Sequence, residues 1–178
     1  MAARRPRRET ALPPARPAAH LSAAIPLALL FAALIVYASL SPFTGWRWPA
    51  QLSWSELLIL PLPPWRDRFD IVANLVGYLP LGLLAYLAGV RSQGRPLRVW
   101  LAAVAGASLL SYAMELAQQC LPGRFPSALD WGLNSAGGLL GATLGALLQF
   151  TRLIDRWQAT RDRWFWRRSR GALVLLLL

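Results

Sequence analysis

Four long apolar stretches dominate this sequence and constrain its fold more than any other feature. They cover residues 21–40, 69–90, 97–119 and 128–150 of the 178. A helix needs roughly 20 mostly apolar residues to cross the hydrocarbon core of a bilayer. Hydrophobic residues make up 56% of the chain and charged residues 15%, whereas soluble domains average about 45–50% and about 25%. The sequence therefore predicts an all-α integral membrane bundle of four transmembrane helices.

Residues 21–40 follow a basic tail, so a cleaved signal peptide is the alternative interpretation of this first stretch. The apolar region of a signal peptide is usually about 7–15 residues long. The uncharged run here is longer, which favours a retained span.

The distribution of arginine predicts the orientation of the bundle. All 19 basic residues are arginine, and most fall in residues 1–20, 91–98 and 151–178; the other side of the bundle holds only Arg47, Arg66, Arg68 and Arg124. Arginine-rich flanks stay in the cytoplasm, so we expect a multi-pass protein of the cell membrane with both termini cytoplasmic. The net charge of +11 is then mainly a topological signal that also attracts membrane lipids, and no nucleic acid is expected as a partner.

Three domains follow from this pattern: a basic cytoplasmic tail (1–20), a four-span membrane domain (21–150) and a basic, Trp-rich interfacial tail (151–178). The last should contain a cytoplasmic amphipathic helix, although a solvated tail is the alternative, and it ends in a short apolar run without an assigned role. Between the first two spans, an outer interfacial loop carries four tryptophans that fit an aromatic belt. In this loop Ser53 and Glu56 have the spacing of a capping box for a short helix.

Each of the last three apolar stretches carries one acid and one amide at its outer end. Residues three or four positions apart share a helix face. Ionisable groups within spans usually face the bundle interior and mark functional sites, although an aspartate at a helix start can simply complement the helix dipole. The pairs are Asp70 with Asn74, Glu115 with Gln118, and Asp130 with Asn134.

Glu115 differs from the two aspartates because it lies near the C-terminal end of its predicted helix, where the dipole disfavours an anion. A partner is therefore expected, and Arg124 is the nearest candidate on the outer side. Pro122, Gly123 and Pro126 predict a rigid turn around this arginine. Its guanidinium could bind a carboxylate or phosphate through two hydrogen bonds, or it could clamp Glu115 or Asp130 in a purely structural role.

The pattern Asp-x3-Asn-x2-Gly occurs at residue 70 and again at residue 130. A duplication of two helical hairpins is one interpretation of this weak repeat. In the last stretch three glycines recur every four residues, which predicts a face for close helix packing. They are Gly137, Gly141 and Gly145.

Several kinds of site are not expected. His20 is the only histidine and Cys120 the only cysteine, so neither a histidine nor a cysteine cluster can hold a metal, and no cofactor is expected. Ser127 has no nearby histidine or lysine and no nucleophile-elbow pattern, which argues against a serine hydrolase.

Three segments together resemble the VanZ-like family, named for a protein associated with teicoplanin resistance. They are FDIVANLVGYLPLGLL, YAMELAQQCLPGR and SALDWGLNSAGGLLGA, in that order within about residues 65–150. The resemblance implies a protein of the bacterial inner membrane linked to the cell envelope and to antibiotic resistance, without an agreed biochemical activity. The family's recurrent polar residues fall on Asp70, Asn74, Glu115, Gln118, Arg124, Asp130 and Asn134.

Three functions remain open from the sequence. The first is binding or modulation of a lipid headgroup or lipid-linked envelope precursor at the outer face, affecting glycopeptide susceptibility. The second is a small membrane enzyme that acts on such a precursor by carboxylate acid–base chemistry, and the third is a structural protein in which the polar groups only fix helix packing. A second copy of the chain or another membrane protein is a further candidate partner. The ligand-binding candidates are Arg124, Asn74, Gln118 and Asn134, and the catalytic candidates are Glu115, Asp70 and Asp130.

Overall fold

The structure, a computed structural model, describes residues 23–50, 52–62 and 67–152. The regular elements in these ranges are all helices, which confirms the predicted all-α class. The long helices begin and end within three residues of the predicted apolar stretches. The five helices are α1 (Ala24–Leu40), α2 (Trp54–Leu57), α3 (Arg68–Arg91), α4 (Pro96–Gln118) and α5 (Ala128–Phe150).

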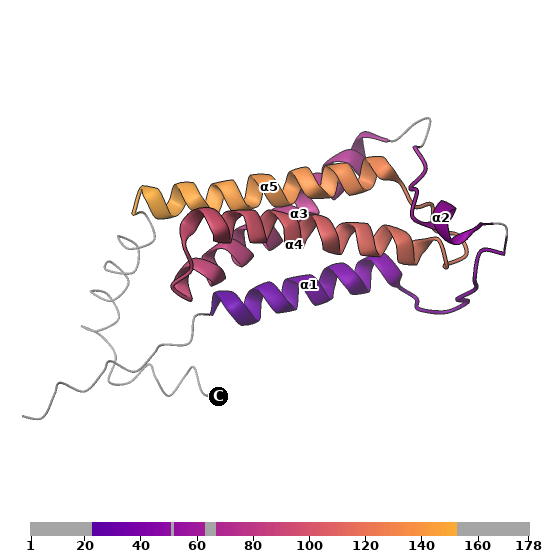
Figure 1. Ribbon diagram of the computed structural model, residues 1–178, viewed down its shortest axis with the longest axis horizontal. Helices are drawn as coiled ribbons and strands as arrows, with labels where there is room; N and C mark the ends of the chain where they lie inside the picture. The colour runs from indigo at the N-terminus through magenta and orange to yellow at the C-terminus, as the bar shows by residue number, and fades with distance from the viewer. Residues whose placement is uncertain (1–22, 51, 63–66, 153–178) are drawn as a thin grey trace, which may run out of the picture.

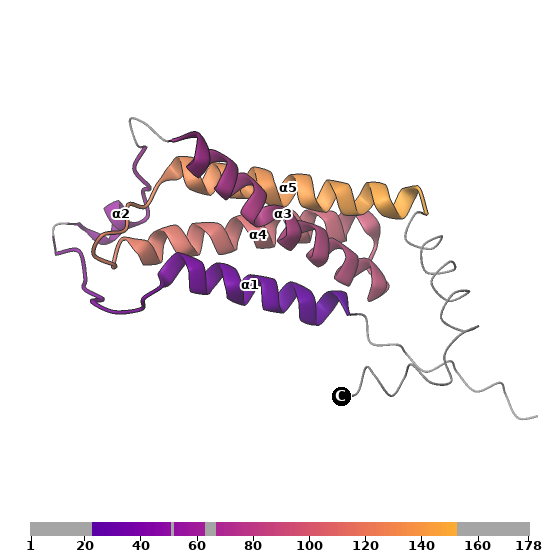
Figure 2. The same ribbon diagram turned by 180° about the vertical axis from the view of Figure 1, so that it is seen from behind.

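The four long helices lie side by side and alternate in direction, and the short α2 lies beyond one end of them (Figures 1 and 2). Helix α5 packs most extensively against α3 and next against α4, while α1 packs against α3 and α4. At the end near α2, which we call the α2 end, α1 and α4 finish and α3 and α5 start.

Small residues allow α3 and α5 to approach closely. A Cβ atom added at Gly137 would collide with the backbone carbonyl of Leu75, and one added at Gly141 would collide with that of Leu79. A Cβ at Gly145 would lie 2.9 Å from Cδ1 of Tyr86. The three glycines spaced four apart therefore all face α3, as expected for a small-residue packing stripe in a membrane helix.

The repeat spacing also matches the register of these two parallel helices. Gly137 packs on Leu75 and Tyr78 of α3, so equivalent positions of the two Asp-x3-Asn-x2-Gly patterns lie at the same level. Their surroundings differ, however, because a Cβ at Gly77 would meet nothing within 4 Å. The two matching segments are therefore aligned along the bundle but are not packed equivalently.

The interior is narrow and the outside is apolar, as expected for a bundle with lipid as its solvent. Helices α3 and α4 are each long and apolar enough to cross a membrane, and only 22% of the apolar window of each is buried. That low burial is unlike the core helix of a soluble protein. Helix α1 is also apolar but has 17 residues. These features support a helical membrane protein.

The loop at the α2 end is tied to the bundle by three hydrogen bonds. The Gln119 side chain donates to the Leu57 carbonyl (2.7 Å), the Tyr112 hydroxyl to the Leu58 carbonyl (2.6 Å), and the Ala128 backbone N–H to the Pro61 carbonyl (2.9 Å). We call residues 57–61 the strap.

The short helix in this loop begins as predicted. Ser53 is the N-cap of α2, and its side chain and that of Glu56 form the reciprocal capping box. Its tryptophan neighbours also interact, since the rings of Trp48 and Trp54 lie 4.5 Å apart between centroids. The basic tail 1–20 and nearly all of the interfacial tail 151–178 lie outside the described residues.

Candidate functional site

Five polar side chains are buried together toward the α2 end of the bundle, and we call them the outer polar cluster. They come from α3, α4, α5 and the turn before α5, so packing of three helices is needed to assemble them. Buried polar groups in proteins are nearly always hydrogen-bonded, which makes their partners informative. The members are Tyr78, Ser111, Glu115, Ser127 and Asn134.

Glu115 is 4% exposed, and its carboxylate holds the start of α5. Its Oε2 accepts a hydrogen bond from the backbone N–H of Ser127 (2.8 Å). Ser127 is the N-cap of α5, and its hydroxyl accepts hydrogen bonds from the N–H groups of Leu129 and Asp130. The positive end of the α5 dipole therefore lies beside this carboxyl group, where it favours a negative charge near the end of α4.

Asn134 and Ser111 connect α5 to α4. The Asn134 side-chain NH₂ donates to the Ser111 hydroxyl (2.9 Å). The side-chain carbonyl of Asn134 and the hydroxyl of Tyr78 are also buried, and neither has a hydrogen-bond partner within the described ranges. The cluster thus joins the helices and keeps two buried polar atoms that the described residues leave unsatisfied.

Arg124 and Gln118 donate hydrogen bonds to backbone carbonyls at the end of α1. Nη2 of Arg124 donates to the carbonyls of Ser41 (2.6 Å) and Ala38 (3.3 Å), and the Gln118 side chain donates to the carbonyl of Ser39 (3.1 Å). The last carbonyls of a helix have no partner within the helix, and a cation near them complements its dipole. Arg124 therefore clamps the end of α1, a role that the sequence did not predict.

The remaining predicted residues lie at the starts of α3 and α5. Asp70 and Asn74 are partly buried, and no hydrogen bond joins either of them to the outer polar cluster among the described residues. Asp130 lies in the first turn of α5, where its N–H is bonded to the Ser127 cap. The three predicted acid–amide pairs therefore share one end of the bundle.

Sequence reasoning missed Tyr78 and Ser111 and gave Ser127 no role. A local signal existed for two of them. Ser111 lies four residues before Glu115 and so shares its helix face, and Ser127 directly precedes an apolar run, as an N-cap residue does. Within the described ranges no group of three or more His, Cys, Asp or Glu side chains could hold a metal ion.

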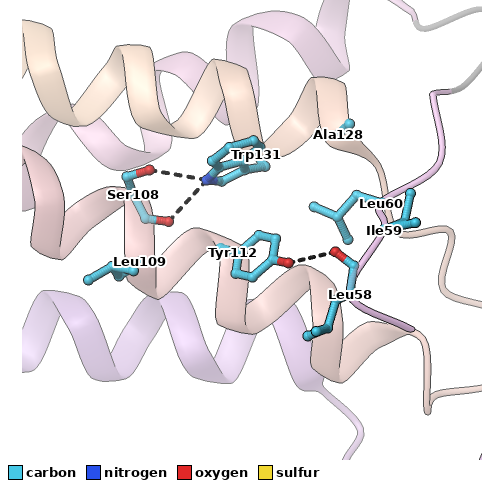
Figure 3. Close-up of a pocket in the computed structure, with 8 residues that line it drawn as sticks. All are labelled: Leu58, Ile59, Leu60, Ser108, Leu109, Tyr112, Ala128 and Trp131. Atoms are coloured by element: carbon cyan, nitrogen blue, oxygen red, sulfur yellow. Dashed lines mark hydrogen bonds between the residues drawn. The ribbon is translucent and has the colours of Figure 1, made fainter. Parts of the chain in front are cut away.

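Two hollows open at the α2 end. One, of about 300 Å³, lies between the loop after α1 and the turn before α5; Arg124, Ser41 and Thr44 are among its lining residues. The other, of about 470 Å³, lies between α4, α5 and the strap (Figure 3). The first has a mixed lining that includes a charged side chain, whereas the lining of the second is mainly apolar and uncharged.

Comparison with known proteins identifies the family. A model of the VanZ/LLP1 family matches residues 18–149, which include the five helices except the last residue of α5, and the whole outer polar cluster. Searches of curated proteins and of solved structures gave no significant match. Because the matched region covers well over half of the chain and contains apolar helices of membrane-spanning length, this membrane protein belongs to the VanZ-like family.

Proposed function

We propose that this protein crosses the cell membrane four times, with both termini in the cytoplasm, and binds an anionic headgroup at its outer face. The headgroup would belong to a membrane lipid or a lipid-linked envelope precursor, and its binding would affect glycopeptide susceptibility. The observation that carries the proposal is the position of Arg124, an exposed guanidinium held in place by hydrogen bonds at the wall of a hollow.

The proposed orientation rests on the two ends of the bundle. The α2 end carries exposed tryptophans, which suit a membrane interface; they are Trp46, Trp48 and Trp54. Among the described residues, the opposite end carries a compact group of arginines between α3 and α4, which suits the cytoplasmic side. They are Arg91, Arg95 and Arg98.

Arg124 is suited to an anion because part of its hydrogen-bonding capacity is already used to position it. Two α1 carbonyls hold Nη2, while Nε and Nη1 have no acceptor within the described residues. A guanidinium binds phosphate or carboxylate oxygens through paired, charge-assisted hydrogen bonds. Prior positioning reduces the entropy lost on binding.

The burial and hydrogen bonding of Glu115 favour a binding function over a catalytic one at the α2 end. A general acid or base must reach the proton that it transfers, but Glu115 is buried and its carboxylate already holds the N-terminus of α5. The hydrogen bonds of Gln118 and Asn134 likewise go to other helices. Arg124 is thus the exposed member of the predicted set, and it lines a hollow.

The test compares Arg124→Gln with Arg47→Gln, a matched loss of one exposed arginine from the outer loop. Full-length proteins in detergent are titrated with phosphatidylglycerol, a polyprenyl phosphate and neutral phosphatidylcholine. Arg124→Gln should weaken binding of both anionic lipids by about tenfold or more, because a hydrogen bond to a charged group contributes about 1.5–3 kcal/mol. Arg47→Gln should have little effect.

A cellular measurement tests the physiological part of the proposal. Cells that express Arg124→Gln at the wild-type membrane level should lose any change in glycopeptide tolerance that the wild type confers. Equal lipid affinity of the wild type and Arg124→Gln, at equal thermal stability, would contradict the binding proposal.

A further inference from the structure

The second hollow at the α2 end is an apolar groove with three distinct walls. Ser108, Leu109 and Tyr112 contribute from α4, Ala128 and Trp131 from α5, and residues 58–60 of the strap form the third wall (Figure 3). Its volume of about 470 Å³ lies within the range of about 300–1,000 Å³ that is typical of small-molecule sites.

The polar side chains in the groove are already hydrogen-bonded to its own walls. The Tyr112 hydroxyl donates to the Leu58 carbonyl (2.6 Å), and Nε1 of Trp131 donates to the hydroxyl (3.1 Å) and carbonyl (3.2 Å) of Ser108. Figure 3 shows these bonds along the sides of the groove. All eight lining residues are uncharged, so the groove offers hydrocarbon surface and no group that would select a charged headgroup.

The groove continues an apolar surface of α4. Leu101, Ala105 and Leu109 are exposed and lie four residues apart, so they form one stripe along this helix. Leu109 lies nine residues before the end of α4, about 14 Å at 1.5 Å per residue. The stripe therefore runs from near the start of α4 to its middle, where Leu109 lines the groove, at the depth of lipid chains and not of headgroups.

The third wall of the groove, formed by the strap, is held in place by hydrogen bonds. Its carbonyls accept hydrogen bonds from Gln119, Tyr112 and the backbone of Ala128. A binding wall that is already fixed loses little conformational freedom when the ligand arrives.

We infer that this groove binds one hydrocarbon chain of a membrane phospholipid, entering sideways from the bilayer. Assignment of the chain to the outer leaflet rests on the orientation proposed above, but binding in the groove does not depend on Arg124. The uncharged lining matches a chain, and the continuous stripe on α4 leads from the bilayer to the groove.

The experiment uses the full-length protein in vesicles of phosphatidylethanolamine and phosphatidylglycerol that contain a phospholipid with a photoreactive diazirine in its acyl chain. Lipid adducts are mapped by mass spectrometry after illumination. Adducts at Leu109 should exceed those at Leu29 of α1 by about tenfold, the ratio for about 1.4 kcal/mol of preferential binding. Leu29 is a fair reference for bulk lipid because both leucines are 67% exposed.

Two variants fill the groove in different ways. Ala128→Phe acts from α5, and Leu60→Trp acts from the strap without altering a long helix. Each should reduce Leu109 adducts to the level at Leu29. The control is Gly132→Phe on α5, where an added Cβ meets nothing within 4 Å, and it should leave the adducts unchanged.

The outcomes separate this inference from the proposed function. Loss of anionic-lipid selectivity in Arg124→Gln with normal Leu109 adducts would leave the groove assignment intact. Equal adduct yields at Leu109 and Leu29, or no effect of either filling variant, would overturn it.

Discussion

The carboxylate of Glu115 accepts a hydrogen bond from the backbone N–H of Ser127 at 2.8 Å, although the two residues belong to different sides of a turn. Ser127 uses its own hydroxyl to cap the first N–H groups of α5. The last turns of α4 and the first turn of α5 are therefore joined by one buried carboxylate and one buried serine, and the relative position of the two helices depends on both.

Replacing Glu115 should show what this bond contributes. Glu115→Leu leaves the buried N–H of Ser127 without its acceptor and should lower thermal stability in detergent, by about 1–3 kcal/mol for an unsatisfied buried group. Glu115→Gln retains an acceptor oxygen and should recover much of the loss. Equal stability of the two variants would show that the bond does not matter.

Ser127→Ala removes the N-cap of α5 and should cost roughly 1 kcal/mol, the usual effect of losing a serine cap. Ser127→Thr keeps the hydroxyl and serves as the control. The measurement is the same thermal unfolding in detergent, and a Thr variant as unstable as the Ala variant would argue that volume, not capping, is decisive at this buried position.

Gly137 and Gly77 occupy equivalent places in the two repeated patterns, but replacing each with alanine should affect the stability of the protein differently. Gly137→Ala brings a Cβ against the Leu75 carbonyl, whereas Gly77→Ala enters open space. Overpacking costs about 1–3 kcal/mol, so Gly137→Ala should lower stability and Gly77→Ala should not. Similar losses in both variants would contradict the packing of α3 against α5.

Acid should open the short helix α2. Hydrogen bonds from the backbone and the side chain of Ser53 lower the pKa of Glu56. A carboxyl group whose pKa is lowered on folding contributes stability above its unfolded pKa, and this contribution is lost as the pH falls through the folded value. The capping box should therefore persist near neutral pH, begin to weaken below about pH 4.3, the ordinary value for glutamate, and be lost only as the pH passes the lower folded value.

The chain has three glutamates, Glu9, Glu56 and Glu115, so carboxyl-labelled glutamate gives an NMR titration that can be assigned by substitution. Ser53→Ala should move the pKa of Glu56 back up toward the ordinary value. An unchanged titration in that variant would contradict the capping box as the cause of the shift.

Tyr112→Phe should loosen the strap. The variant keeps the ring but loses the hydrogen bond to the Leu58 carbonyl, which is worth about 1 kcal/mol. Hydrogen exchange in residues 57–61 should accelerate while exchange in α3 stays constant. Tyr37→Phe on exposed α1 provides the control, and equal effects of the two variants would argue against a specific tie.

Local patterns were sufficient for the helices and for one cap. The apolar stretches predicted four long helices, and Ser53 with Glu56 predicted the capping box, because both features depend on residues within a few positions of each other. The same short-range logic placed Gly137, Gly141 and Gly145 on one face of α5, and the structure shows that α3 covers it.

Partners distant in the sequence were not predictable in this way. The sequence offered Glu115 and Asp130 as possible partners of Arg124, and it did not predict the hydrogen bonds of Arg124 to the carbonyls of Ala38 and Ser41, 86 and 83 residues earlier. These bonds could not be predicted because α1 ends beside the turn only when it packs against α3 and α4.

The sequence by itself therefore determined the class of the protein: apolar helices of membrane length with polar groups at their ends. Only the tertiary structure decided what those polar groups do. Close contact of α3 with α5 through glycine, and the strap across α4 and α5, bury Glu115, leave Arg124 exposed and form the groove beside Leu109. The physical reason is that helix formation depends on local periodicity, whereas burial and partner choice depend on which faces pack together.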